Sequence, residues 1–207
     1  MKLQCFELGV IQTNSYVLLI DEKAILIDTG DFSIEEQLNF ILKKEAKLEA
    51  VFFTHGHFDH ITGIDAILKL DKNMPIYMGE NEIDFLEKPE YNLGGMFQMI
   101  ISKKTEELNI KKISDKDIID NYGIIAYEMP GHTKGEMVFY IPELKSCVVG
   151  DLIFEHGHGR TDLPTSNHSQ LKKSILRLFD LLPEETMIFS GHGASFRLKD
   201  WDKSQLF

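Results

Sequence analysis

The sequence of 207 residues contains little cysteine, Cys5 and Cys147 being its only two. Two cysteines cannot form a disulfide framework, and neither lies in a C-x-x-C spacing. Both fall in strand-like apolar runs, so we expect buried free thiols and a reducing, cytoplasmic setting. No apolar run approaches the ~20 residues that a membrane span requires. No apolar region of the kind found in signal peptides follows Met1 and Lys2. We therefore expect no secretory signal and no membrane partner.

Positive charge is also scarce, since 22 Lys and Arg stand against 33 Asp and Glu and the formal net charge is −11. The pairs Lys103-Lys104 and Lys111-Lys112 have acidic neighbours and indicate solvated surface. Nucleic acid binding usually requires a basic patch, so nucleic acid is excluded as an expected partner. A hydrophobic content of 43% is typical of a globular protein. The length fits one domain over residues 1–207.

The periodicity of apolar residues predicts both strands and helices. Strands are predicted over 2–8, 15–20, 24–27, 48–53, 74–78, 118–120, 124–129, 138–141, 146–149 and 187–189. Helices are predicted from a capping box at Ser33 and Glu36 to about Lys44, over 63–70 and 80–87, from Ser169 to about Phe179, and from Phe196 onward, with a loop over 88–95. Because strands followed by helices recur in the second half, we expect two packed sheets with helices outside.

The most informative stretch is Thr54-His55-Gly56-His57-Phe58-Asp59-His60, which follows the predicted strand over 48–53. Four groups able to bind a metal fall within six residues of this H-x-H-x-D-H loop. Imidazole suits zinc, iron or manganese, and carboxylate adds compensating negative charge. A polar surface turn is the alternative interpretation, and the spacing of the four groups argues against it.

Three further candidates each follow a strand-like run and lie next to glycine. They are His132 in PGHTKG, Asp151 in VVGD and His192 in SGHG. Glycine allows the backbone to approach a metal closely and to adopt positive φ. A single histidine at a strand end is usually a surface or core residue, but three such sites downstream of H-x-H-x-D-H indicate a shared metal centre.

With these motifs the sequence resembles the metallo-β-lactamase-fold hydrolases, and within them the small glyoxalase II-like branch. The resemblance extends over nearly the whole chain, through Asp28-Thr29-Gly30, the histidine loop, PGHTKG, GD at 150–151, GRTDLP at 159–164 and GHG at 191–193. It implies an α+β fold, a four-layer αββα sandwich, because proteins of this family share that architecture. It indicates fold and metals well, and substrate poorly, since one fold hosts many chemistries.

The resemblance also implies roles for individual residues in a two-metal site. The first metal is expected on His55, His57 and His132, and the second on Asp59, His60 and His192, with Asp151 bridging both. Asp28 is expected to accept a hydrogen bond from a ligand histidine, the alternative being a plain turn residue. Zinc is the expected metal, with iron or manganese also accepted by this ligand set.

The resemblance to the glyoxalase II-like branch implies hydrolysis of a small thioester at this dinuclear site, with S-lactoylglutathione the first substrate expected. Two divalent ions, the carboxylates of Asp59 and Asp151 and a bridging hydroxide sum to +1, which suits an oxyanion formed at an attacked carbonyl. The larger glyoxalase II enzymes carry a C-terminal helical domain that contacts glutathione. Only 15 residues follow His192, so we expect no such domain. The segment 92–99 is a candidate substrate wall in its place.

Other functions of the same fold stay open from the sequence. A persulfide dioxygenase would bind one Fe(II) on His55, His132 and Asp151, but that family has cysteine where this chain has His158 and phenylalanine where it has Leu163. A lactone or other ester hydrolase is a further alternative. Arg160 and Asp162 are expected to pair and hold their loop, and the remaining histidines are assigned to loops or surface: His156, His158 and His168.

Overall fold

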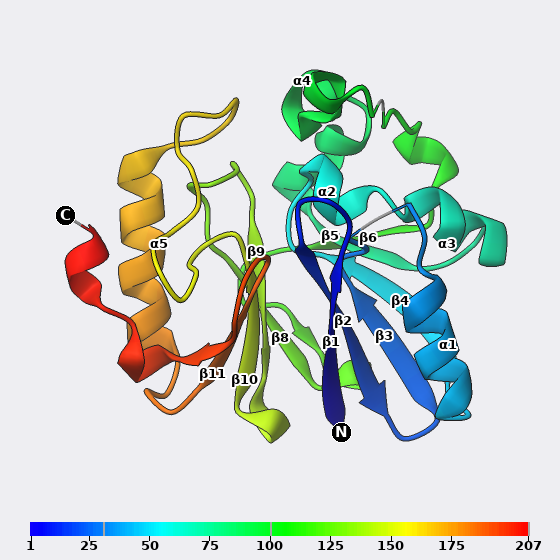
Figure 1. Ribbon diagram of the computed structural model, residues 1–207, viewed down its shortest axis with the longest axis horizontal. Coiled ribbons are helices and arrows are strands. Elements are labelled where there is room, and N and C mark those ends of the chain that lie inside the picture. Colours follow the sequence, from blue (N-terminus) through cyan, green and yellow to red (C-terminus); the bar gives the residue numbers. More distant parts are fainter. Residues whose placement is uncertain (31, 100, 207) are drawn as a thin grey trace.

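The chain, seen in a computed structural model, is described over residues 1–30, 32–99 and 101–206, and its strands there form two six-stranded sheets (Figure 1). In spatial order the first sheet contains β1 (Lys2–Leu8), β2 (Thr13–Ile20), β3 (Lys23–Ile27), β4 (Lys47–Phe53), β5 (Ile76–Gly79) and β6 (Ile110–Ile113). The second contains β12 (Phe196–Arg197), β11 (Met187–Ser190), β10 (Ser146–Gly150), β9 (Met137–Ile141), β8 (Ile124–Glu128) and β7 (Ile118–Ile119). Both sheets mix antiparallel and parallel pairs, the parallel ones being β3 to β6 and β10–β11.

Helices cover the outer face of each sheet, so the molecule has four layers. The helices that carry this argument are α1 (Glu35–Lys43), α2 (Phe58–Ile61), α3 (Ile64–Leu70), α4 (Pro89–Asn92) and α5 (His168–Leu181). In Figure 1, α1 and α3 lie on the side of the first sheet, and α5 lies on the side of the second. The predicted αββα sandwich is therefore confirmed.

Alternation along the strands explains why the two sheets pack face to face. In β2, Val17 packs in the core beneath α1 and α3, whereas Tyr16 and Leu18 pack between the sheets. In β9, Val138 faces the core beneath α5, and Phe139 faces the space between the sheets. A strand with apolar residues on both faces must be covered on both sides, and this requirement produces a four-layer architecture.

Several local predictions are wrong, each for a physical reason. Cys5 is exposed rather than buried, because β1 lies at the edge of its sheet; only Cys147 is a buried thiol. The capping box does not form, since α1 begins at Glu35 and the Ser33 hydroxyl accepts a hydrogen bond only from the Glu35 N–H at 3.3 Å. Asn167, rather than Ser169, caps α5 by accepting the Gln170 N–H.

The segments without clear periodicity differ most from the prediction. Residues 80–86 form a 3-10 helix, residues 89–92 form α4 inside the predicted loop, and β6 went unpredicted. The predicted strand over 74–78 begins only at Ile76, and the tail from Phe196 is a short strand followed by 3-10 turns rather than a helix. No helix in the described part of the chain is long and apolar enough to cross a membrane.

Candidate metal centre

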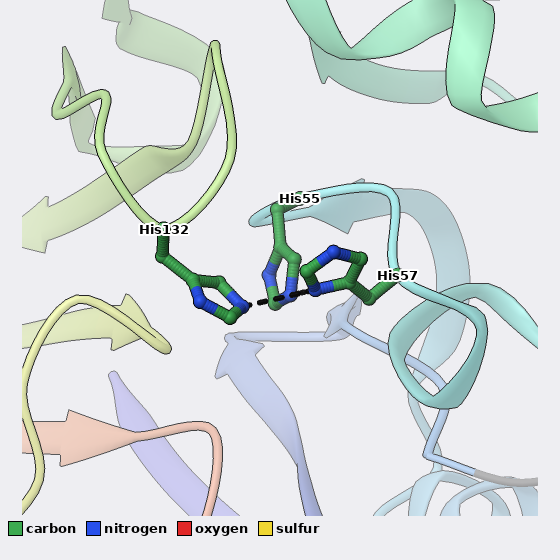
Figure 2. A group of neighbouring side chains, drawn as sticks. All are labelled: His55, His57 and His132. Carbon is green, nitrogen blue, oxygen red and sulfur yellow. Dashed lines mark hydrogen bonds between the residues drawn. The ribbon is translucent and has the colours of Figure 1, made fainter. Parts of the chain in front are cut away.

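The seven predicted ligands converge because they all follow strand ends at one edge of the two sheets. The histidine loop follows β4, His132 lies between β8 and β9, Asp151 follows β10, and His192 follows β11. Figure 2 shows His132 reaching from the second sheet toward His55 and His57 of the first. The centre therefore spans the interface between the sheets, and neither sheet carries it alone.

The first group consists of three buried imidazoles. Nδ1 of His57 lies 3.1 Å from Nε2 of His55 and 2.9 Å from Nε2 of His132. All three residues have at most 3% of their surface exposed. Three ring nitrogens that face one another in a buried site form the kind of ligand set that binds zinc or iron.

The second group adds carboxylates. Oδ2 of Asp59 lies 3.5 Å from Nε2 of His60 and 3.3 Å from Nε2 of His192. Asp151 lies between the two groups, with Oδ1 3.5 Å from Nε2 of His60 and Oδ2 3.5 Å from Nε2 of His132. Its carboxylate thus touches ligand candidates of both groups, which is the placement that a bridging ligand requires.

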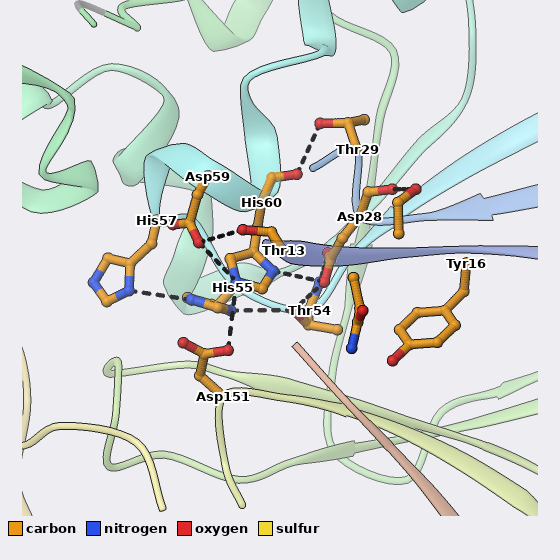
Figure 3. A network of polar contacts seen from close by, with 12 residues as sticks. Thr13, Tyr16, Asp28, Thr29, Thr54, His55, His57, Asp59, His60 and Asp151 are labelled. Carbon is orange, nitrogen blue, oxygen red and sulfur yellow. Dashed lines mark hydrogen bonds and ion pairs between the residues drawn. The ribbon is translucent and has the colours of Figure 1, made fainter. Parts of the chain in front are cut away.

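A hydrogen-bond network behind the ligands fixes the orientation of their rings (Figure 3). Asp28 accepts hydrogen bonds from Nδ1 of His60 at 2.8 Å, from the Thr54 hydroxyl at 2.7 Å and from the Thr54 N–H at 2.8 Å. The bond to His60 holds the ring proton on Nδ1 and leaves Nε2 to face Asp59 and Asp151. The structure thus places Asp28 where the sequence predicted it, beside a ligand candidate.

Other supporting contacts were not predicted. The Thr13 hydroxyl donates to Oδ2 of Asp59 at 2.9 Å, and Nδ1 of His132 lies 3.0 Å from the backbone carbonyl oxygen of Arg160. Both contacts join segments far apart in the chain, so no local motif indicates them. They orient ligand candidates in the same way as Asp28 does.

Two buried glutamates behind the centre were also missed. The two carboxylate oxygens of Glu82 accept the N–H groups of Gly56 and Gly135 at 2.8 and 2.7 Å, which ties the histidine loop to the loop of His132. Glu136 accepts the Asp151 N–H at 2.7 Å. Burial raises the pKa of Glu82 to about 8, although the hydrogen bonds from the two glycine N–H groups oppose the shift.

Burial and neighbouring charges set the protonation of the ligands. Burial, reinforced by the adjacent His132, lowers the pKa of His57 to about 3, and burial also lowers the pKa of His55. Burial alone would raise the pKa of Asp151, but the nearby histidines, His60 foremost, together outweigh it and lower that pKa to about 2. The neighbouring carboxylates raise the pKa of His60 despite its burial. Neutral imidazoles and ionised carboxylates are the forms that bind metal, so a metal on His60 would displace a proton.

Close approach at the centre requires glycine at two positions. Gly150 has φ +54, and a Cβ there would collide with Thr54 and Glu136. A Cβ on Gly191 would collide with Oδ1 of Asp151 and with the His60 ring. The glycines noted in the sequence therefore permit two strand ends to meet beside the ligands.

The donor set fits divalent metal ions. Nε2 of His60 and Oδ1 of Asp151 are buried and have no hydrogen-bond partner among the described residues, although they lie 3.5 Å apart. Unpaired buried polar atoms are costly unless something binds them, and a cation between them satisfies both.

The remaining candidates lie farther out. Arg160 pairs with Asp162 through two bonds of 2.9 Å, as predicted, and it also lines the cavity above the ligands. His158 is half-buried, and His156 and His168 are exposed; none of the three belongs to the described residues that line this cavity.

The cavity above the ligands has a volume of about 460 Å³ and reaches five of the seven ligand candidates, which are His57, Asp59, His132, Asp151 and His192.

Comparison with known proteins agrees with this geometry. Residues 8–192 match the family model of the metallo-beta-lactamase superfamily, and the chain belongs to that superfamily. Its described sheets and helices form the fold of that superfamily, whose members include metallo-hydrolases. Over 195 residues it is 31% identical to the probable metallo-hydrolase YqgX of Bacillus subtilis, with 93% of this chain and 90% of the relative covered.

Two solved structures are similar over almost their whole length. The BLEG-1 B3 metallo-beta-lactamase superposes with a TM-score of 0.86 at 29% identity, covering 96% of this chain and 95% of the other. TTHA1623 in a di-iron-bound form superposes with a TM-score of 0.83 at 27% identity, covering 95% of each chain. The match therefore covers the sheets and the loops that carry the ligand candidates.

Proposed function

We propose that this chain is a metal-dependent hydrolase that holds two divalent ions and cleaves a small thioester of the glyoxalase II type. His55, His57 and His132 would hold the first ion, Asp59, His60 and His192 the second, and Asp151 both. The observation that carries the proposal is the Asp151 carboxylate, which lies within 3.5 Å of a histidine from each group. TTHA1623, solved with two irons, supports two metals on this fold, and zinc is the metal we propose to test first.

Divalent ions in this centre would lower the pKa of bound water and polarise a carbonyl oxygen. The chain itself contributes orientation and charge. Asp59 and Asp151 would accept hydrogen bonds from the attacking water and balance the positive charge. Attack on the carbonyl carbon forms the new C–O bond, the C–S bond breaks, and the proton lost from water accompanies the thiolate, so that the products are an acid and a thiol.

A cysteine or serine nucleophile is not needed for this reaction. Cys147 is a buried residue of β10, and burial raises the pKa of its thiol well above the ordinary value. Cys5 is exposed at the edge of the first sheet. Neither thiol lines the cavity above the ligands.

The second ligand group favours a hydrolase over a mononuclear persulfide dioxygenase. A dioxygenase triad of His55, His132 and Asp151 would use one metal only. Asp59, His60 and His192 nevertheless lie within ligating reach of one another, and Thr13 holds Asp59 in place at 2.9 Å. A complete second group is expected of a site that binds two metals.

The test is hydrolysis of S-lactoylglutathione by purified, metal-analysed protein with and without chelator. We expect about two metals per chain and turnover that the chelator abolishes. Two metals without turnover of this substrate would point to lactones or other thioesters, whereas one bound iron without any hydrolysis would favour the dioxygenase.

The variant His57→Ala tests the ligand assignment. It removes the nitrogen that lies close to both His55 and His132, so occupancy of the first metal and hydrolysis should fall together, by at least 100-fold in kcat. The exposed His168→Ala is the matched control and should keep both. Normal turnover in His57→Ala would overturn the assignment.

A further inference from the structure

A second cavity opens beside the one that contains the ligands. We call it the side cavity and the other the metal cavity. The side cavity has a volume of about 300 Å³, and the residues that line it include Val10, Ile11, Phe32, Phe58, Asp59 and Phe97. Ile11, Phe58, Asp59 and Phe97 line both cavities, so the two share a wall. Asp59, a ligand candidate, lines both cavities, so the side cavity reaches the edge of the metal centre.

The wall of the side cavity is apolar. Phe58 is buried, and Phe97 stacks on it with ring centroids 4.5 Å apart and an interplanar angle of 25°. The Thr62 hydroxyl is already committed, because it donates to the Phe58 carbonyl oxygen. Asp59 is the one charged side chain among the described lining residues, and its Oδ2 faces Thr13 and His192. The rest of the lining therefore favours a hydrocarbon group over a polar one.

The apolar residues at the rim are unusually exposed. Val10 is 96% exposed, Phe32 56% and Phe97 50%. A cluster of exposed apolar side chains beside a cavity marks a binding surface more often than a plain protein surface. Phe97 belongs to a segment whose backbone is fixed nearby, because the buried Asn92 donates to the carbonyl oxygens of Phe85 and Ile101 and accepts the Gly94 N–H.

The described lining of the metal cavity offers little positive charge to pair with the carboxylates of glutathione, so we expect S-lactoylglutathione to be turned over less efficiently than a thioester of an uncharged thiol. Glutathione carries two carboxylates, and Arg160 is the single cationic side chain among the described residues that line this cavity apart from its histidines. The Arg160 guanidinium already makes two bonds of 2.9 Å to Asp162. A thioester substrate whose thiol half has no carboxylates would bring no unpaired charge into this site.

We propose that the side cavity binds an apolar acyl group, so that the preferred substrates are thioesters of short-chain or medium-chain alkyl or aryl acids with an uncharged thiol. This inference rests on the proposed thioester hydrolysis and specifies its substrate. A cavity of about 300 Å³ is at the small end of ligand sites, so it holds one chain or one ring and not a whole ligand.

The experiment is a chain-length series with zinc-loaded protein. The substrates are S-acetyl, S-butanoyl, S-hexanoyl and S-octanoyl N-acetylcysteamine, with S-lactoylglutathione for comparison. Each methylene buried should raise kcat/KM roughly fourfold, corresponding to about 0.8 kcal/mol, until the cavity is full. The hexanoyl thioester should therefore exceed both the acetyl thioester and S-lactoylglutathione.

Two variants assign that dependence to the side cavity. Phe97→Ala removes the stacked wall and should reduce the gain per methylene while leaving metal content unchanged. Leu70→Ala is the matched control, because Leu70 is 52% exposed, close to the value for Phe97, and does not line either cavity. It should keep the full chain-length dependence. An unaltered dependence in Phe97→Ala would assign the apolar contact elsewhere and overturn the proposal.

The outcomes separate this inference from the proposed function. Chelator-sensitive hydrolysis of the acetyl thioester with no gain for longer chains would overturn the inference and keep the function. If no thioester turns over, calorimetry with ketone analogues, in which CH₂ replaces the sulfur, still tests the cavity. The hexanoyl analogue should then bind more tightly than the acetyl analogue to the zinc-loaded protein, and equal binding would overturn the inference.

Discussion

Asp28 concentrates three hydrogen bonds on one carboxylate, and its backbone adopts the left-handed conformation with φ +55. Aspartate tolerates this conformation better than most residues, so the strain is modest. In this position the side chain reaches both Thr54 and His60. A single residue before α1 thus connects the end of β3 to the second group of ligand candidates.

The variant Asp28→Asn should weaken binding at the second metal position by about 10- to 100-fold. An amide has one acceptor oxygen, so it cannot serve both His60 and the Thr54 N–H. The measurement is competition between protein and a chelator of known affinity. Asp65→Asn, an exposed change in α3, is the control. Equal affinity in both variants would show that Asp28 does not orient a ligand.

Glu82→Gln should destabilise the metal-free protein by about 1–3 kcal/mol at pH 5.5. Each oxygen of Glu82 accepts a backbone N–H, and the amide nitrogen of glutamine would face one of them as a second donor. Urea unfolding of the chelated proteins measures the difference in the free energy of unfolding.

The pH dependence of that difference follows from the raised pKa of Glu82. Its value is about 8 in the folded chain and 4.5 for the ordinary group, so the folded state holds the proton more tightly. The contribution of this proton is fully present below about pH 4.5 and is lost as the pH rises through 8. The free energy of unfolding of the wild type should therefore exceed that of Glu82→Gln by less at pH 8 than at pH 5.5. A difference that stays constant or grows would contradict the assignment.

At the scale of elements, the segment from α4 to residue 99 shapes the entrance to both cavities. It was predicted as a loop and as a substrate wall; α4 replaces part of the loop, whereas Leu93, Met96 and Phe97 do line the metal cavity. Asn92, the last residue of α4, is buried, and its side chain makes three hydrogen bonds to backbone groups. These bonds fix the segment where it leaves α4.

Asn92→Ala should therefore raise KM about tenfold while metal content stays at its wild-type value. The variant leaves the backbone groups of Phe85, Gly94 and Ile101 without their partner, and the wall that carries Phe97 loosens. Steady-state kinetics and metal analysis measure the two quantities. Asn109→Ala, which removes one exposed hydrogen bond to Asn73, is the control. Loss of metal from Asn92→Ala would instead indicate a role in the centre itself.

The elements with strong periodicity were predictable, and those held by distant contacts were not. Bulky apolar residues between Leu48 and Phe53 specify a buried strand whatever surrounds them. The ligand candidates were predictable for the same reason, because their spacing and their positions at strand ends are local features of the sequence. Thr13 meets Asp59 across 46 positions and Glu82 meets Gly135 across 53, and no local pattern encodes such pairs.

At the scale of the whole molecule, chelation should lower the melting temperature. Metal that binds only the folded chain stabilises it by about 2.7 kcal/mol at a free concentration of 100 Kd, or roughly 5–10 °C for a chain of this size. Thermal unfolding of the zinc-loaded protein with and without chelator measures the shift. His57→Ala should show a smaller one, and an identical shift would mean that the stabilising metal binds elsewhere.

The position of the centre between the sheets also bears on how the chain matures. The first group joins residues 55 and 132, and the second is complete only with His192, after β11 has joined its sheet. A chain emerging from the ribosome would thus have built nearly all its strands before it could retain both ions. Metal capture is then a late event that reports successful assembly, and a misfolded chain would leave metal in the cellular pool.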